Sequence, residues 1–232
     1  GLDIVQGNQV SRAGFPVRAY QLYRTNRLYQ PGENYNLPYN GTRTTGAGDI
    51  KYVDMDGNDT LNAKDRVLMG NNFPRYDFSL NLNADYKGFD LNIFLFGVAK
   101  RDNYISGVGV EPFNAGNWFA TGLTSALERW TPQKTNSAYP RLFSGGNGNY
   151  IASDFWLRNG AFMRVKHITL GYTLDKKWAD KIGVQQLRFY VNAVNPLTFS
   201  NYEPGFDPEI SNTNGAFYPI MKTTTIGVNL RF

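Results

Sequence analysis

The chain contains no cysteine among its 232 residues and only one histidine, His167. Without cysteine there is no disulfide framework, no thiolate metal site and no cysteine nucleophile. One histidine permits no metal centre built from several histidines, and no G-x-S-x-G motif accompanies it. A lone histidine within an expected strand is usually a hydrogen-bonded structural residue. We therefore predict no catalytic residues and no enzymatic activity.

Long apolar runs and basic clusters are also missing. No apolar run approaches the length of a transmembrane helix, so any membrane crossing must be made by strands. The net charge is +5, with Lys and Arg scattered along the chain. A nucleic-acid partner would require a basic patch, and the sequence has none. We therefore expect no nucleic-acid partner. Residues 1–5 lack the basic start and apolar segment of a signal peptide, so we expect a piece of a longer protein.

The chain is rich in aromatic residues, and apolar and polar residues alternate along parts of it. Aromatics make up 15% of the residues, and the 24 glycines suit a strand-rich protein with many turns. The last eight residues alternate strictly, with one side of a strand apolar and the other side polar. The apolar side carries Ile226, Val228, Leu230 and Phe232, and the polar side carries Thr225, Gly227, Asn229 and Arg231. This pattern is typical of the last strand of an outer-membrane β-barrel, although a half-buried terminal strand of a soluble β-protein can share it.

The clearest hairpin lies at residues 76–96. Alternation over 76–87 is followed by Gly88 and by a second alternating segment that starts at Phe89. Each strand has about the ten residues that a tilted transmembrane strand needs. Further strands are expected over 162–174, with a bulge near Lys166 and His167, and over 187–193. A weaker candidate covers 15–24, which makes six strands with the terminal one.

The connections between these strands alternate in length. Long connections cover 25–72, 98–156 and 200–220, whereas short ones cover 87–88 and 175–184. Counting back from the terminal strand places all long connections at one end of the sheet and all short ones at the other. Long extracellular loops and short periplasmic turns are the rule for outer-membrane barrels. The pattern therefore predicts an all-β chain that forms an antiparallel segment of a transmembrane β-barrel with long extracellular loops.

The alternation also predicts which side chains meet lipid and which face the lumen. The expected lipid-facing positions are Phe78, Leu80, Leu82, Leu91, Ile93, Leu170, Val228 and Leu230. The expected lumenal positions are Asn81, Asn83, Asn92 and Asn229.

An acidic run over 54–65 has the spacing of a calcium loop. Such loops place oxygen ligands at positions one, three, five, seven, nine and twelve. Those positions are Asp54, Asp56, Asn58, Thr60, Asn62 and Asp65. Two departures are Asp59 at the sixth position, where glycine permits a sharp turn, and Asp rather than Glu at the twelfth. The alternatives are a structural Ca²⁺ site and an Asp/Asn-rich turn capped by its own side chains.

Two loop features have less specific interpretations. Asp207 and Glu209 resemble a glycosidase carboxylate pair, although nearby loop acids more often form turns or bond sugars. The spacing of apolar residues over 119–130 predicts a short helix that ends at Pro132. A rival interpretation of the chain is a carbohydrate-binding β-sandwich, soluble or surface-attached, that uses the loop aromatics Trp118, Trp130 and Tyr202.

Several runs, taken in order, resemble the carboxy-terminal part of SusC/RagA-type TonB-dependent outer-membrane transporters. These runs are GFPV (14–17), GDIKYVDMDGN (48–58), DRVLMGN (65–71), DFWLRNGAFMRVKHITLGY (154–172), LRFYVNAVNPLTF (187–199) and GFDPE (205–209), followed by the terminal strand. Their order is far more specific than any single run. Together they cover nearly the whole of residues 1–232, which we interpret as one carboxy-terminal barrel portion without the plug domain.

The resemblance implies a barrel of about 22 strands whose lumen is plugged. It implies import of glycans or peptides across the cell outer membrane, with a SusD-like surface lipoprotein as partner and energy supplied by TonB through the plug. The remaining partners would be the rest of the barrel, outer-membrane lipid and the barrel-assembly machinery. That machinery would recognise the terminal strand through Thr225, Gly227, Leu230 and Phe232.

Overall fold

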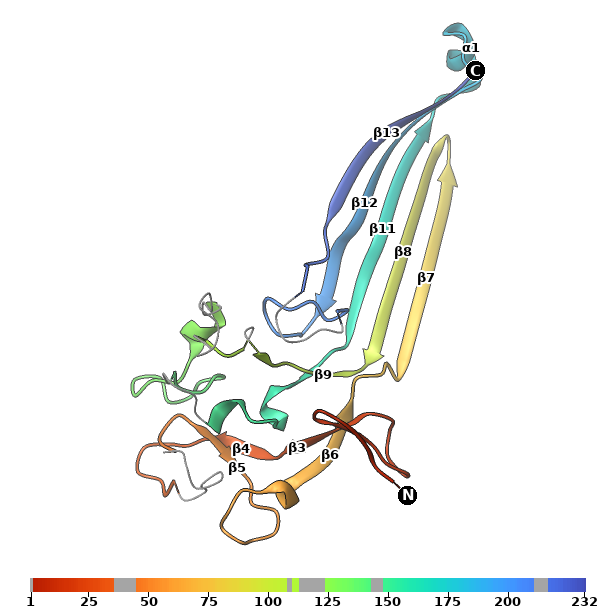
Figure 1. The fold of residues 1–232 in the computed structure, drawn as a ribbon. Helices are drawn as coiled ribbons and strands as arrows, with labels where there is room; N and C mark the ends of the chain where they lie inside the picture. Colours follow the sequence, from red (N-terminus) through yellow and green to blue (C-terminus); the bar gives the residue numbers. More distant parts are fainter. Residues whose placement is uncertain (1, 36–44, 108–109, 113–123, 143–147, 211–216) are drawn as a thin grey trace.

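Five long antiparallel strands form one sheet, which we call the wall. The structure is a computed structural model and describes residues 2–35, 45–107, 110–112, 124–142, 148–210 and 217–232. The strands, in their order across the wall, are β13 (Thr223–Arg231), β12 (Gln186–Ser200), β11 (Phe162–Thr173), β8 (Phe89–Lys100) and β7 (Tyr76–Tyr86). In Figure 1 the wall stands as a tall curved sheet with the smaller elements gathered at one end.

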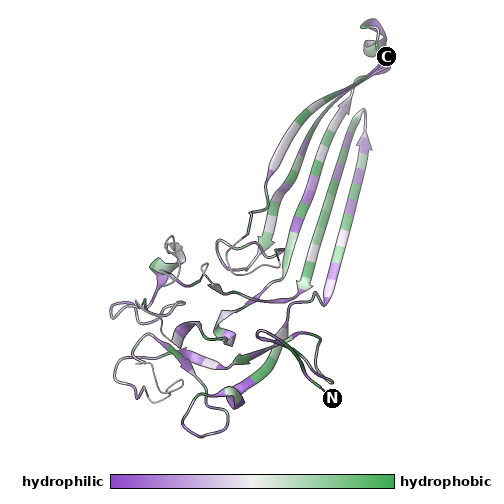
Figure 2. Ribbon diagram, viewed as in Figure 1, coloured by the Kyte–Doolittle hydropathy of each residue, from purple (hydrophilic) through white to green (hydrophobic). Residues whose placement is uncertain are grey.

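Each strand of the wall has an apolar side and a more polar side because successive side chains point to opposite faces. Figure 2 shows this alternation as bands of contrasting colour along the strands. The register aligns the bands, since Leu82 lies opposite Ile93 and Ile93 lies opposite Ile168. The apolar face comprises Phe78, Leu80, Leu82, Leu91, Ile93, Leu95, Val165, Ile168, Leu170, Val191, Leu197, Ile226, Val228 and Leu230. The polar face includes Asn81, Asn83, Asp90, Asn92, Arg164, His167, Thr169, Arg188, Asn192, Thr225 and Asn229.

The predicted division of side chains between two faces is thus confirmed. On the edge strand β7, neither face is covered. All 11 residues of β7 are exposed. Leu80 and Leu170 on the apolar face expose 48% and 49% of their surface. An apolar face this open is unusual for a sheet in water, because exposed contiguous apolar surface marks an interaction with a partner or a membrane.

The bulge expected in the third long strand is present. The register of β11 against both neighbours shifts between Val165 and His167. Lys166 is the extra residue against β8, whereas on the other side Asn195 and Pro196 of β12 lie opposite Lys166 without a register partner. Because one residue is inserted, Val165 and Ile168 fall on the same face although three positions separate them. The bulge therefore keeps the apolar face continuous along β11.

Short connections lie at one end of the wall and long ones at the other (Figure 1). Lys87 and Gly88 join β7 to β8 with φ angles of 48° and 87°. A two-residue hairpin of type I′ requires positive φ at both positions, and glycine meets that requirement without strain. The second short connection contains the helix α1 (Lys176–Lys181). We call this end of the wall the turn end and the opposite end the loop end.

Three smaller sheets and several short helices make up the loop end. One sheet has the order β1 (Ile4–Gln6), β2 (Gln9–Ser11), β3 (Ala19–Tyr23) and β6 (Arg66–Asn71). Two more sheets pair β4 (Thr25–Leu28) with β5 (Ile50–Tyr52) and β9 (Asp102–Tyr104) with β10 (Leu157–Asn159). The 3₁₀ helices are η1 (Ala63–Asp65), η3 (Thr124–Glu128), η4 (Gly148–Tyr150) and η5 (Asp154–Trp156).

The buried core belongs to this loop end rather than to the wall. Its central members are Leu28, Ile50, Ile105, Trp130, Trp156 and Tyr202. They come from segments far apart in the sequence, so the long connections fold together as one packed body. Within the described residues, no helix is both long enough and apolar enough to span a bilayer.

One strand expectation was wrong in its placement. The segment 15–24 does form a strand, β3, but β3 pairs with β2 and β6 and does not join the wall. The described residues therefore contribute five wall strands and not six. The reason is burial: four of the five residues of β3 are buried, whereas all 11 residues of β7, at the edge of the wall, are exposed. The strand expected over 187–193 is longer than predicted, because β12 continues through Asn195 and Pro196 to Ser200.

Candidate functional site

A ladder of amides crosses the polar face near the middle of the wall. Nδ2 of Asn92 donates to Oδ1 of Asn81 at 2.8 Å and to Oδ1 of Asn83 at 2.5 Å. Oδ1 of Asn92 lies 2.5 Å from Nε2 of His167. His167 is thus the hydrogen-bonded strand histidine that the sequence predicts, and Asn81, Asn83 and Asn92 share one face of the wall, as the alternation predicts.

An ion pair crosses the polar face at the turn end. Arg188 on β12 donates to both carboxylate oxygens of Asp90 on β8, with Nε at 2.9 Å. The pair passes over Gly171 on the intervening strand β11. A Cβ atom at Gly171 would lie 2.4 Å from both side chains. The glycine therefore makes room for a bidentate pair that ties three strands together.

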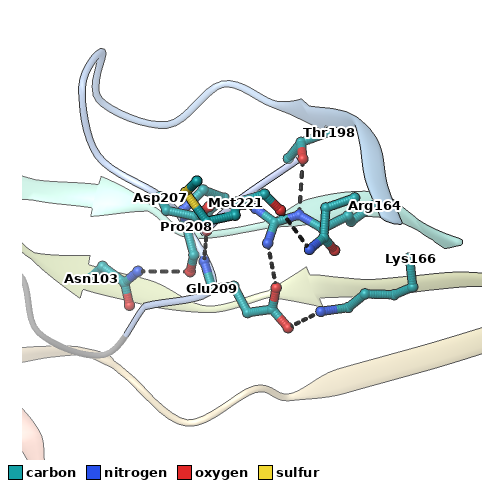
Figure 3. Close-up of polar contacts among 9 residues, drawn as sticks. Asn103, Arg164, Lys166, Thr198, Asp207, Pro208, Glu209 and Met221 are labelled. Carbon is teal, nitrogen blue, oxygen red and sulfur yellow. Dashed lines mark hydrogen bonds and ion pairs between the residues drawn. The ribbon is translucent and has the colours of Figure 1, made fainter. Parts of the chain in front are cut away.

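A buried arginine at the loop end of the polar face holds the segment that follows β12 (Figure 3). The side chain of Arg164 is 2% exposed and donates to Glu209 at 2.5 Å and to Asp207 at 2.6 Å. Its Nε donates to Oγ1 of Thr198 at 2.8 Å. Lys166, the bulge residue, forms a second ion pair with Glu209. We call these five residues the arginine clasp.

The clasp gives Asp207 and Glu209 a structural environment. Both carboxylates bond to Arg164, and Nδ2 of Asn103 donates to the carbonyl of Pro208 between them at 3.4 Å. Two acids held by one guanidinium favour the interpretation as a loop anchor over the glycosidase pair. Sequence reasoning missed Arg164, although a charged residue in phase with the polar face and beside an expected bulge was a usable signal.

A buried acid, Glu203, links two of the long connections. Glu203 is 7% exposed and accepts from Nε of Arg158 and from the hydroxyl of Tyr139, each at 2.5 Å. Burial, together with the hydrogen bond to Glu203, raises the pKa of Tyr139 to about 12. The tyrosine therefore stays protonated and acts as a hydrogen-bond donor.

The acidic loop brings three of its carboxylates together. Oxygens of Asp54, Asp56 and Asp65 lie within 4.8 Å of one another. Asp59 has φ 57°, the left-handed conformation that glycine supplies at the sixth position of a calcium loop. The aspartate thus forms the sharp turn at that position, so this departure from the pattern does not prevent the loop shape.

The other three predicted ligands bond within the loop. Nδ2 of Asn58 donates to Asp56 at 3.0 Å, and Nδ2 of Asn62 donates to the carbonyl of Thr60 at 3.0 Å. Oδ1 of Asn62 also accepts from Lys64 as the N-cap of η1. The structure therefore groups the three aspartates and uses the two asparagines mainly to shape the turn.

Backbone amides also surround Asp54. Burial raises its pKa, but hydrogen bonds from the backbone N–H groups of Gly57, Asp59 and Asp56 outweigh that effect and lower the pKa from its ordinary 3.8. The carboxylate is therefore ionised near neutral pH, as a cation ligand must be. Oδ1 of Asp54 accepts two of these bonds and Oδ2 accepts one, so Oδ2 keeps a lone pair for a metal. The residues fit a hard cation such as Ca²⁺.

The terminal strand β13 lies at an open edge of the wall. Among the described residues it pairs with β12 only, with Thr225 opposite Asn192 and Leu230 opposite Leu187. Gly227 lies under the ring of Tyr190, where a Cβ atom would come within 2.3 Å of that ring. Phe232 follows the strand and is 81% exposed. The four residues of the expected assembly signal thus occupy an unpaired edge and its end.

Two of the three loop aromatics of the rival interpretation are not available as a binding surface. Trp130 and Tyr202 are buried at 7% and 9% exposure in the core of the loop end. Trp118 lies outside the described residues, as does the first half of the helix expected over 119–130. The described half of that segment forms the 3₁₀ helix η3.

Comparison with known proteins finds several similar chains, although no protein-family model matches. The chain is 30% identical over 246 residues to TonB-dependent receptor P3 of Formosa agariphila, covering 97% of this chain and 23% of that receptor. It is 31% identical over 186 residues to TonB-dependent receptor SusC of Bacteroides thetaiotaomicron, covering 78% of this chain and 17% of that receptor. The chain thus spans less than a quarter of the length of these relatives.

The fold has a solved counterpart. A chain in the structure of the RagAB peptide importer in its open-open state matches with a TM-score of 0.71 at 20% identity. The match covers 99% of this chain and 24% of that one. The resemblance to SusC- and RagA-type receptors that the sequence runs indicate is therefore confirmed in both sequence and fold.

Proposed function

Because the chain is a homologue of the TonB-dependent receptors that include SusC, we propose that it forms barrel wall and surface loops of an outer-membrane transporter. The observation that carries the proposal is the wall itself. One of its faces is apolar and exposed, the other is polar, and its long and short connections are sorted to opposite ends. The strands of a membrane barrel have two such faces because lipid meets one face and an aqueous lumen meets the other. Outer-membrane barrels also have long extracellular loops and short periplasmic turns.

The height of the apolar face supports the same proposal. Tyr76 and Tyr86 lie at the two ends of β7 on the apolar face, and Phe78 and Phe89 lie near them. The ten steps between the two tyrosines span roughly 33 Å along the strand. A tilt of about 40° reduces this to roughly 25 Å, the usual height of the apolar band between two aromatic girdles.

The sandwich alternative is less consistent with these observations. A sandwich buries one face of each sheet against another sheet about 10 Å away. In the described residues, the strand β7 is exposed along its whole length on both faces, and the buried core lies in the loop end.

The whole protein would import glycans or peptides, with a SusD-like lipoprotein above the loop end. TonB would supply energy through a plug carried by the rest of the protein. The support is homology to SusC, together with the fold shared with the RagAB peptide importer. Direct ligands of the substrate would come from residues of the loop end.

A structural Ca²⁺ in the acidic loop is a second part of the proposal. The three grouped aspartates and the left-handed turn at Asp59 favour it. The cation would offset the repulsion among Asp54, Asp56 and Asp65 and fix the loop that precedes β6. It would have no catalytic role.

The membrane orientation can be tested with single cysteines in a cysteine-free background of the full-length protein. Gln133 lies exposed in a turn of the loop end, and Lys177 lies exposed in α1 at the turn end. A membrane-impermeant maleimide applied to intact cells should label Gln133→Cys and spare Lys177→Cys. Permeabilised cells should show both labelled. Labelling of Lys177→Cys in intact cells, or labelling of neither after export is verified, would contradict the proposed orientation.

A further inference from the structure

The helix α1 forms a foot that projects beyond the turn end of the wall (Figure 1). It connects β11 to β12 and begins at Asp175, whose carboxylate accepts from the backbone N–H of Lys177 at 2.9 Å. Ala179 and Val184 are buried, at 0% and 8% exposure, and the foot contacts β12. The foot therefore has a fixed inner side and a free outer side.

The exposed side of the foot combines apolar groups with three lysines and one acid, Asp180. Trp178 and Ile182 are 60% and 59% exposed. Lys176, Lys177 and Lys181 are exposed as well, and Nζ of Lys181 lies 4.4 Å from the centre of the Trp178 ring. An exposed tryptophan and isoleucine beside lysines form an amphipathic surface that fits neither bulk water nor a dry interior.

Aromatic residues also border the apolar face at the end of the wall from which the foot projects. Tyr86, Phe89 and Phe232 are exposed there, and Nζ of Lys87 lies 5.1 Å from the centre of the Tyr86 ring. The pairing of Lys87 with Tyr86 repeats the pairing of Lys181 with Trp178. Aromatic rings with adjacent lysines are suited to the boundary between acyl chains and headgroups, where rings meet lipid and ammonium groups meet phosphate.

We propose that this foot is a membrane anchor that lies in the phospholipid headgroup layer on the periplasmic side. Trp178 and Ile182 enter the boundary between headgroups and acyl chains, and the three lysines contact phosphate groups. The anchor rests on the proposed transmembrane wall, since its position follows from the wall's orientation. It adds a contact that the strands alone do not make, and it fixes the depth of the wall strands that it joins.

The depth of the foot can be measured in the full-length protein in nanodiscs of phosphatidylethanolamine and phosphatidylglycerol. A nitroxide is attached to Ile182→Cys, and its relaxation by oxygen, which enters lipid, is compared with that by a water-soluble nickel chelate. Leu80→Cys on the apolar face and Gln133→Cys at the loop end are matched references. We expect the oxygen-to-nickel ratio at 182 to exceed that at 133 several-fold and to stay below that at 80.

Two further variants test the part played by the tryptophan. Trp178→Ser should lower the ratio at 182 toward the value at 133, whereas Trp178→Tyr should retain it because tyrosine is also an interfacial residue. An aqueous ratio at 182 in the parent protein, weak relaxation by both reagents, or no effect of Trp178→Ser would each overturn the anchor. If Leu80→Cys itself is not lipid-exposed, the transmembrane wall fails. If Leu80→Cys is lipid-exposed and Ile182→Cys is aqueous, the membrane anchor is refuted and the transmembrane wall is not.

Discussion

At the scale of single residues, one step along a strand of the wall decides whether a side chain belongs to the apolar or the polar face. Leu80 and Asn81 are consecutive and lie near the middle of β7. Leu80 lies opposite Leu95 on the apolar face, whereas Asn81 lies opposite Phe94 and accepts from Asn92. The two positions share the same strand and depth, which makes them a matched pair for a test of the environment on each side.

Arginine at Leu80 should destabilise the full-length protein in liposomes by about 2–4 kcal/mol, the cost of a cation near the bilayer midplane. Arginine at Asn81 should cost little, because that side chain faces water. The measurement is the free energy of unfolding in urea. Equal costs at the two positions would refute the assignment of the apolar face to lipid.

The arginine clasp allows a second test at the same scale. Arg164→Met leaves Asp207 and Glu209 without their shared cation. Breaking a fully buried ion pair costs about 3–5 kcal/mol, and the partial exposure of these acids, 19% and 26%, reduces our expectation to about 2–3 kcal/mol. We also expect faster amide hydrogen exchange in the segment after β12, around Glu203 to Ile210.

Lys166→Met provides the control for the clasp. Among the described residues Lys166 forms one ion pair, with Glu209, and its ammonium lies 5.7 Å from the centre of the Phe96 ring. Its side chain is 27% exposed, so its loss should have a much smaller effect on stability and exchange. Similar effects of the two substitutions would mean that Arg164 is not the centre of the anchor.

At the scale of elements, the acidic loop and the terminal strand each have a separate role. The loop precedes β6, and Asp65 within it caps η1 by accepting from the backbone of Asn62 at 2.7 Å. Asp65 also accepts from the backbone N–H of Met55 at 2.8 Å, which joins the two ends of the loop. A cation bound by the same carboxylate would therefore stabilise both connections.

Removal of calcium with a chelator should loosen this loop and create new protease cleavage between residues 48 and 72. Asp56→Asn, which keeps the size of the side chain and removes its charge, should weaken the response to added Ca²⁺. Cleavage that does not change with chelator would support the alternative of a turn capped by its own side chains.

A strongly acidic pH should destabilise the same loop. The folded-state pKa of Asp54 is lowered, so its contribution to stability is present above the ordinary value of 3.8 and is lost as the pH falls through the lowered pKa. The loop should therefore stay closed at mildly acidic pH when Ca²⁺ is present. Opening above pH 5 would contradict this prediction.

The terminal strand allows a prediction about assembly. Leu230 and Val228 are 54% and 51% exposed at an edge that pairs on one side only, so the assembly machinery could add a strand there. Deletion of Phe232 from the full-length protein should reduce the amount in the outer membrane much more than it lowers the Tm of the protein that does assemble. Unchanged surface levels would refute its role in the assembly signal.

At the scale of the whole molecule, the wall has two open edges within the described residues. β7 pairs only with β8, and β13 pairs only with β12. Exposed edges invite pairing with other chains, and five strands cannot close a barrel, since bacterial single-chain barrels begin at about eight. In a barrel the remaining strands would cover both edges.

Residues 1–232 expressed alone should therefore not yield a folded monomer. Size-exclusion chromatography in detergent should show aggregates or mixed oligomers, because unpaired edges associate. The full-length protein, purified in the same detergent, is the control. A monodisperse fragment with cooperative unfolding would contradict the requirement for further strands.

Strand identity and strand faces were determined by the sequence alone. Period-two alternation decides which side chains share a face, so the apolar face, the bulge beside Lys166 and the sorting of long and short connections could all be predicted. The tight turn at Lys87 and Gly88 also depends only on neighbouring residues, so the sequence predicts it. The acidic loop could also be anticipated, because its ligand candidates lie within twelve consecutive residues, 54–65.

The tertiary structure decided what depends on residues distant in sequence. The strand over 15–24 looks like a weak wall strand, but its burial against β2 and β6 places it in the loop end. Arg164 and Glu209 are 45 residues apart, so only the folded chain brings their charges together. From the sequence, Trp130 and Tyr202 could be surface aromatics of the loops. In the structure, the packing of the long connections buries both of them. Local periodicity carries no information on such contacts, because they depend on how loops of unrelated pattern fold onto one another.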